Sequence, residues 1–136
     1  MESRYLYRGK RIDNREWVEG FLFMVNDVPY ILPHHKTGQP IHADNLLKTA
    51  VEVLKDTVCR CTGQYDKNGK LIWENDIANC MDAECCGYIS WNESEAGFYF
   101  DVLLEDGRFE EEHIYDYQDC MEVIGNNFDN PELLEV

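Results

Sequence analysis

The chain has 136 residues, a hydrophobic fraction of 44% and a formal net charge of −15, which is typical of one small globular domain, with residues 1–56 and 57–136 as candidate subdomains. Its aromatic content of 12% argues against disorder, and no apolar run approaches the ~20 residues of a membrane-spanning helix. No long apolar segment follows the first residues, Met1–Tyr5, so we expect no secretory signal and a cytoplasmic location.

Charge is distributed very unevenly along the sequence. Residues 1–73 carry 11 Lys/Arg and 9 Asp/Glu, a net charge of +2, whereas residues 74–136 carry 1 and 18, a net charge of −17. Such acidity repels nucleic acid phosphates and attracts basic partners. We therefore expect a basic protein or another copy of the chain as partner, and no direct DNA binding. Solubility is the alternative explanation for the acidity.

An N-terminal β-hairpin is the first predicted element. Tyr5–Tyr7 and Glu16–Val25 have the aromatic and β-branched composition of strands, and the polar residues 8–15 between them predict a turn. This turn concentrates positive charge, which is either solvated or available to an acidic partner or a phosphate. Its cations are Arg8, Lys10, Arg11 and Arg15.

Proline and histidine dominate the next stretch. Val28–Pro33 contains two prolines, which predict at most an edge strand. Three histidines follow, His34, His35 and His42. A polar surface loop explains them better than a metal site does, because no matching carboxylates accompany them. Residues 44–54 fit either a helix or a strand, and we expect a helical turn near 44–49 with extended chain from 51.

The strongest turn signal of the chain is Asn68-Gly69. Asn-Gly accepts the positive φ of a tight primed turn and predicts a central hairpin, with Thr57–Thr62 as the strand that leads into it. Alternation in Phe98–Leu104 predicts a strand whose even-numbered residues face the core. Further short strands are expected at residues 76–81, 87–91 and 120–124, and Pro131 is expected to open a final helical turn.

These short strands, with turns between them, predict an α+β but predominantly β domain with little helix. The expected architecture is a small antiparallel β-barrel or sandwich.

Six cysteines are present, namely Cys59, Cys61, Cys80, Cys85, Cys86 and Cys120. Their spacings do not match the Cys-x2–4-Cys pairs of zinc sites. We therefore expect free thiols and no cofactor.

An acidic run supplies the main candidate for chemistry. It comprises Glu110, Glu111 and Glu112 beside His113, with Asp116 and Asp119 nearby. Such side chains can hold a divalent ion and activate water, so a metal-dependent hydrolase or nuclease built on residues 110–119 is the alternative function. In an extended strand, however, Glu110 and Glu112 point to one side while Glu111 points to the other. No P-loop, GxSxG or GxGxxG motif occurs, and a non-enzymatic binding module is therefore the first hypothesis.

Three motifs, in order, span nearly the whole chain. The first is Tyr7–Arg11 through Glu16–Gly20; the second is Thr57-Val58, Thr62–Lys70 and Trp73–Ile77; the third is Glu122–Asn126 with Asn130–Leu134. In sequence and spacing they resemble the YopX-like family of bacteriophage and prophage proteins. Asn75 departs from the pattern, since the family usually has glycine there, and Asn adopts positive φ less freely than Gly.

The resemblance implies a small β-rich phage protein that acts in the cytoplasm of a bacterial host or lysogen, with no catalytic residues to carry over. The charge distribution indicates as partner a basic host or phage protein, or a second copy in a homo-oligomer built head to tail or through the N-terminal hairpin. The shared positions are turns and strand starts, which are expected to define the fold. They are Thr62, Gly63, Asn68, Gly69, Asp76, Gly125, Asn126, Asn130 and Pro131.

Overall fold

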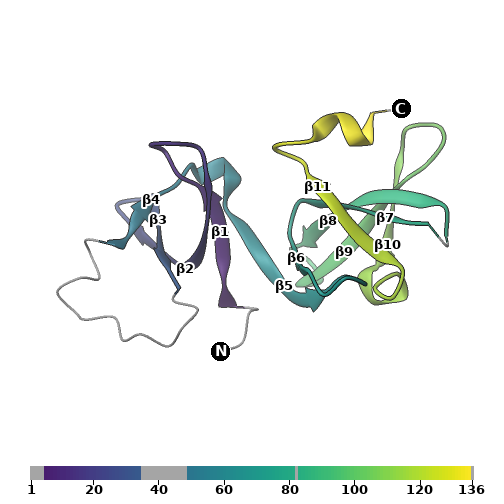
Figure 1. The fold of residues 1–136 in the computed structure, drawn as a ribbon, viewed down its shortest axis with the longest axis horizontal. Helices are drawn as coiled ribbons and strands as arrows, with labels where there is room; N and C mark the ends of the chain where they lie inside the picture. The colour runs from purple at the N-terminus through teal and green to yellow at the C-terminus, as the bar shows by residue number, and fades with distance from the viewer. Residues whose placement is uncertain (1–4, 35–48, 82, 136) are drawn as a thin grey trace. The chain divides into compact units, whose positions relative to one another are not determined.

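A computed structural model describes residues 5–34, 49–81 and 83–135. In these residues antiparallel strands predominate, and helical structure is confined to short 3-10 turns and the single residue Thr49. The strands form a six-stranded sheet of order β4-β3-β2-β1-β5-β6 and a five-stranded sheet of order β10-β9-β8-β7-β11 (Figure 1). The predicted β-rich class is confirmed. The sheets are sandwich-like and do not close into a barrel. Within this described part, no helix is long and apolar enough to cross a bilayer.

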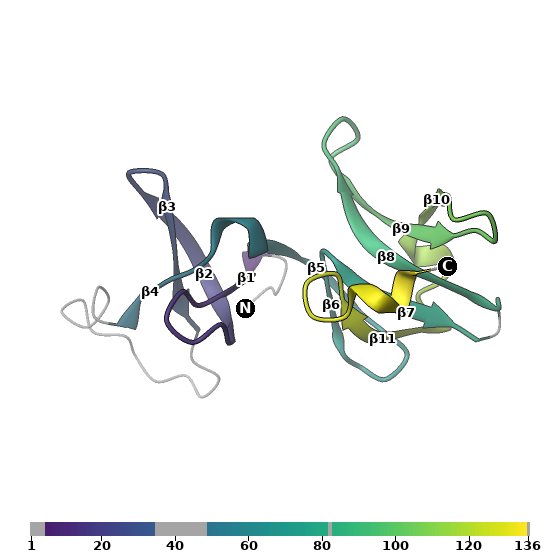
Figure 2. The same ribbon diagram turned by 90° about the horizontal axis from the view of Figure 1, so that it is seen from above.

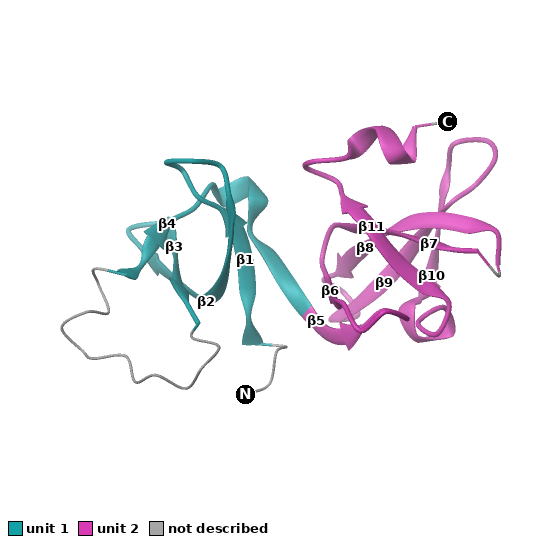
Figure 3. Ribbon diagram, in the orientation of Figure 1, with its two compact units in different colours: residues 1–61 teal, residues 62–136 magenta. Residues whose placement is uncertain are grey.

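The chain divides into two compact units, residues 1–61 and residues 62–136 (Figure 3). Strand β5 (Cys59–Tyr65) runs from the first unit into the second. The first unit contains eight Asp/Glu and nine Lys/Arg, a net charge of +1, and the second contains 19 and three, a net charge of −16. The acidity of the chain therefore belongs almost entirely to the second unit.

Strands β1 (Tyr7–Lys10) and β2 (Trp17–Val25) form the predicted N-terminal hairpin, with Tyr7 opposite Gly20. One expectation was wrong in detail. Arg8 and Lys10 lie within β1 and not in the turn, because β1 is paired with β2 along its whole length and with β5 at Tyr7 and Arg8.

Strand β3 (Val28–Pro33) is not an edge strand, contrary to expectation, because it lies between β2 and the two-residue β4 (Val51–Glu52). The prolines are tolerated because only Tyr30 and Ile31, which lie between them, pair with β4. The Pro29 carbonyl also accepts a hydrogen bond from the Val53 N–H at 3.2 Å. The chain is extended at residues 51–53, as predicted, but the 3-10 turn η2 (Lys55–Thr57) follows, so the strand expected from Thr57 begins only at Cys59. Most of the expected helical turn near 44–49, together with His35 and His42, lies outside the described residues.

A close backbone approach holds β2 against β3. A Cβ atom on Gly20 would lie 2.0 Å from the Leu32 carbonyl oxygen, so only glycine permits this spacing. The buried apolar side chains of the first unit come from β3, from β5 and from residues next to β1 and β4. They are Leu6, Ile31, Leu32, Val53, Cys59 and Cys61.

The second unit contains the remaining strands (Figure 2). They are β6 (Leu71–Trp73), β7 (Asp76–Cys80), β8 (Cys85–Asn92), β9 (Gly97–Leu103), β10 (Phe109–His113) and β11 (Met121–Asn126). Three 3-10 turns lie wholly within the described residues, namely η2 (Lys55–Thr57), η3 (Ile114–Asp116) and η4 (Pro131–Leu134). Thus Pro131 does open a final helical turn, and Cys85 and Cys86 begin a strand where a connection was expected.

The core of the second unit confirms most of the predicted alternation in β9. Phe100 and Val102 are buried in the main hydrophobic cluster and Phe98 packs against it, whereas Leu104 lies beyond the end of β9. The other members of the cluster come from neighbouring strands and from η3. They are Ile72, Ala78, Cys80, Ile89, Ile114, Met121 and Val123.

The central turn reverses the chain as predicted, but it is not a primed turn. Gly69 has φ +81°, while Asn68 does not have the positive φ that a type I′ turn requires. The reason is the Asp66 carboxylate, whose Oδ1 accepts hydrogen bonds from the N–H groups of Asn68 at 2.9 Å and Lys70 at 2.8 Å. This side chain organises the loop as an Asx turn, and only Gly69 adopts the left-handed conformation.

Candidate functional site

Asp66 connects the central turn to the far end of the chain. Its Oδ2 accepts a hydrogen bond from the backbone N–H of Val123 in β11 at 3.0 Å. Burial acts to raise the pKa of Asp66, but hydrogen bonds from the N–H groups of Val123, Lys70 and Asn68 outweigh it, so the pKa lies below its usual 3.8. Asp66 is therefore a buried, ionised anchor between two segments of the second unit.

The shared positions around Thr62 and Asp76 also organise backbone. Thr62 donates its hydroxyl hydrogen to the Ile72 carbonyl at 2.7 Å, and Asp76 accepts from the Trp73 N–H at 2.8 Å while only 2% exposed. Gly63 has φ +77°, a conformation that favours glycine. Asn75 has φ +72°, so asparagine adopts the left-handed conformation here.

The C-terminal loop is built on two asparagines. Asn126 Oδ1 accepts hydrogen bonds from the N–H groups of Phe128 at 3.0 Å and Asp129 at 2.9 Å. The Asn130 side chain packs so closely on Gly125 that a Cβ there would lie 2.5 Å from Asn130 Oδ1. These positions direct the chain into η4, which begins at Pro131. The structure thus gives the shared residues a role in backbone geometry.

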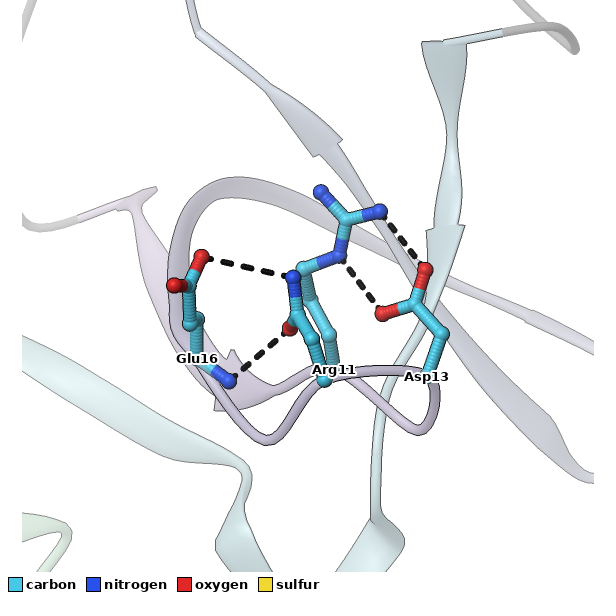
Figure 4. A network of polar contacts seen from close by, with 4 residues as sticks. Arg11, Asp13 and Glu16 are labelled. Atoms are coloured by element: carbon cyan, nitrogen blue, oxygen red, sulfur yellow. Dashed lines mark hydrogen bonds and ion pairs between the residues drawn. The ribbon is translucent and has the colours of Figure 1, made fainter.

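The four N-terminal cations do not gather at one point. Arg11 forms a two-pronged ion pair with Asp13, with Nε–Oδ1 and Nη2–Oδ2 distances of 3.0 and 2.8 Å (Figure 4). This hydrogen bonding raises the pKa of Arg11 and lowers the pKa of Asp13. Arg15 lies in the exposed turn with φ +63°. The four cations therefore do not form one cluster, because the Asp13 carboxylate binds Arg11 within the same turn.

Arg8 and Lys10 lie over an aromatic ring instead. The guanidinium carbon of Arg8 is 4.7 Å and the Lys10 Nζ is 5.4 Å from the centroid of Trp17. Trp17 is directly opposite Lys10 in the β1–β2 register, so the three side chains project from one face of the sheet. Cation–π attraction of this kind holds both cations against the ring.

The acidic run lies on β10, at an edge of the five-stranded sheet. Glu110 and Glu112 lie opposite Val102 and Phe100, while Glu111 lies opposite Asp101. Strand alternation therefore puts Glu110 and Glu112 on the side of the core and Glu111 on the opposite side. In the parts of the chain that the structure describes, no group of three His, Cys, Asp or Glu side chains is arranged to hold a metal ion.

The opposite side of β8, β9 and β10 carries a mixed set of rings and carboxylates that we call the acidic aromatic face. Successive strands place Tyr88 opposite Asp101 and Asp101 opposite Glu111. Tyr99 lies in the same way opposite His113. Because the alternate positions Ile89, Phe100 and Val102 enter the core, this set points away from it. The face comprises Tyr88, Tyr99, Asp101, Phe109, Glu111 and His113.

Ring contacts order the side chains of the acidic aromatic face. The Tyr88 and Phe109 rings meet edge to face with centroids 5.1 Å apart, and His113 lies 5.3 Å from Tyr99. His113 also stacks on Tyr115, which is 65% exposed. The aromatic residues are thus held in place while part of their surface stays in contact with solvent.

Hydrogen bonds also fix the carboxylates of this face. Asp101 Oδ1 accepts from the Ser90 hydroxyl at 3.1 Å, and Glu111 accepts from the Asn92 amide at 3.4 and 3.5 Å. The Tyr99 hydroxyl donates to Glu95.

Both tyrosines experience a negative environment. Burial, with the neighbouring Asp101 carboxylate, raises the pKa of Tyr88 to about 12. The hydrogen bond to Glu95, with further repulsion from Glu111, raises the pKa of Tyr99 to about 12. Ring faces beside carboxylates are the surroundings in which a lysine or arginine side chain binds favourably.

Glu111 and its neighbours were predicted from the sequence as a candidate site, but the aromatic half of the face was not. The signal was present as period-two alternation, with Tyr88 and Ser90 in one strand and Tyr99 and Asp101 in the next. This alternation does not by itself reveal the face, because the three strands come together only through their register.

The fold and these turns define a small, predominantly β protein whose shared residues shape the backbone. Comparison with known families agrees: the model described as "YopX protein" matches residues 6–135. The chain belongs to the YopX family, as its motifs predicted. No curated protein matches the chain.

Proposed function

We propose that this YopX-family protein is a non-enzymatic binding module whose acidic aromatic face binds a lysine- and arginine-rich segment of a partner protein. It would act in the cytoplasm of a bacterial host or lysogen, on a basic host or phage protein. The observation that carries the proposal is the alternation of rings and carboxylates across three paired strands, from Tyr88 through Asp101 to Glu111.

The net charge of the second unit favours a positively charged partner. The second unit carries −16, so a cationic segment is attracted at long range before any contact forms. At short range, the aromatic rings add cation–π attraction and apolar area for the methylene groups of lysine or arginine. A surface with charge alone would bind any polycation. The rings of this face add contacts that depend on the shape and position of each lysine or arginine side chain.

The test uses the full chain and a short oligo-arginine peptide, with an oligo-glutamate peptide as the control ligand. We expect calorimetry to detect oligo-arginine binding at about 50 mM salt that weakens at about 500 mM, because salt screens exposed charges. Asp101→Asn combined with Glu111→Gln should weaken binding at least about fivefold, since both carboxylates would contact the ligand.

A matched control separates this face from net charge. Glu132→Gln combined with Glu135→Gln removes the same charge from the exposed C-terminal turn. It should change binding less than twofold, by about 0.4 kcal/mol or less. Equal losses in the two double variants would show that only overall charge matters, and no binding by the parent chain would refute the proposal.

A further inference from the structure

Three cysteines from separate parts of the second unit converge beside its core. Cys80 ends β7 and is fully buried, Cys85 begins β8, and Cys120 immediately precedes β11. The thiols of Cys80 and Cys120 both donate to the carbonyl oxygen of Tyr117, at 3.5 and 3.3 Å. The sequence spacings gave no sign of this grouping, since Cys80 and Cys120 are far apart in the chain.

Backbone register brings Cys80 and Cys120 to the Cα–Cα spacing of a disulfide bond. Met121 lies opposite Cys80 in the β7–β11 pair, so Cys120 is one residue from the position facing Cys80. Opposed Cα atoms in antiparallel strands are about 4.5–5.5 Å apart, and a diagonal neighbour is about 6 Å away. Disulfides span Cα separations of about 4.4–6.8 Å. Both thiols already donate hydrogen bonds to one carbonyl oxygen, so their sulfur atoms lie near each other. Cys85 lies directly opposite Cys80 in the β7–β8 pair and is the competing partner.

We propose that Cys80 and Cys120 form an oxidisable pair, a redox modification site that ties β7 to β11 through a disulfide bond. The proposal concerns a different part of the second unit from the acidic aromatic face and does not rest on the binding function. Cys120 is the entry point because it is partly exposed while Cys80 is buried.

The chemistry balances with a hydroperoxide as oxidant. The Cys120 sulfur attacks the O–O bond and becomes a sulfenic acid, and the peroxide is reduced to water or an alcohol. The Cys80 sulfur then attacks the Cys120 sulfur, the S–S bond forms, and the hydroxyl leaves as water with the thiol proton. Two thiols lose two electrons in total, and the peroxide accepts both. Burial raises the pKa of Cys80, so its thiol ionises less readily and Cys120 is the first to react with the peroxide.

The test treats the folded full chain with hydrogen peroxide, blocks the remaining thiols by alkylation, and maps the products by mass spectrometry. We expect loss of two hydrogen atoms and a linked pair of peptides that contain Cys80 and Cys120. The melting temperature of the oxidised protein should exceed that of the reduced protein by at least about 5 °C, because the bond closes a loop of about 40 residues.

Two variants and a control test which cysteines form the disulfide bond. Cys120→Ser should abolish the linked product, while Cys86→Ser, which alters a cysteine outside the group that shares Tyr117, should leave it intact. Cys80→Ala is a second variant that should also abolish the linked product. Because Cys80 lies in the core, this variant is used only if it still shows cooperative thermal unfolding. A dominant Cys80–Cys85 bond, or sulfinic acid at Cys120 without any disulfide, would overturn the proposal.

Discussion

The carboxylate of Asp66 and the backbone N–H of Val123 form a hydrogen bond of 3.0 Å although 57 residues separate them. The bond joins the central turn, in which Asp66 also accepts hydrogen bonds from Asn68 and Lys70, to strand β11. A single side chain therefore organises the turn locally and attaches it to the five-stranded sheet, and this relationship leads to the first two predictions.

Asp66→Ala should destabilise the second unit by about 2–4 kcal/mol, because it leaves a buried N–H of Val123 without its charged acceptor. Denaturant unfolding monitored by tryptophan fluorescence measures the change. Asp119→Ala, at an exposed position that precedes Cys120, is the matched control and should stay within about 0.5 kcal/mol of the parent. A loss below about 1 kcal/mol for Asp66→Ala would mean that the contact to β11 contributes little.

Stability should fall in acid partly through Asp66. Its pKa in the folded state lies below the usual 3.8, so its contribution is fully present above that value and is lost as pH falls through the folded pKa. Unfolding titrations between about pH 6 and pH 2 should therefore show a decline below about pH 4 that is shallower in Asp66→Asn. The same slope in both proteins would assign the acid sensitivity to other carboxylates.

Gly69→Val should destabilise the protein by about 1–3 kcal/mol, since a β-branched residue resists the φ of +81° observed there. Beyond Gly69 and its two chain neighbours, no atom lies within 4 Å of a Cβ at this position, so the cost comes from backbone strain alone. Gly69→Asn is the control, because asparagine tolerates the left-handed conformation, and it should retain most of the stability. Thermal melting that ranks the two variants equally would contradict the assigned conformation.

Self-association, if the chain forms oligomers, should be head to tail and should weaken with salt. The cations that flank Trp17 in one copy would meet the acidic second unit of another, since acidic surfaces repel each other near neutral pH. Sedimentation at about 50 mM and about 500 mM salt measures this, as exposed charges are screened over about 8 Å at physiological ionic strength. Lys10→Gln should weaken the assembly more than Lys55→Gln, whose side chain pairs with Asp27 at 3.7 Å. A monomer at both salt concentrations, or an assembly that tightens with salt, would refute this interface.

Much of the secondary structure of this protein could be predicted from residues that lie close together in the sequence. The N-terminal hairpin, the core alternation in Phe98–Val102 and the reversal at Gly69 all follow from residues close together in the chain. The family motifs could be recognised for the same reason, because each is a short run of turn and strand residues. What these residues do is also local, since Thr62, Gly125 and Asn126 shape backbone near themselves.

Tertiary structure alone decided the features that depend on register between distant strands. The type of the central turn follows from the Asp66 carboxylate, which Val123 helps to hold. The acidic aromatic face exists because three strands align Tyr88, Asp101 and Glu111 in one row. Cys80 reaches Cys120 only because β7 pairs with β11. A one-residue change of register would send each of these side chains to the opposite face, and no short stretch of sequence specifies that choice.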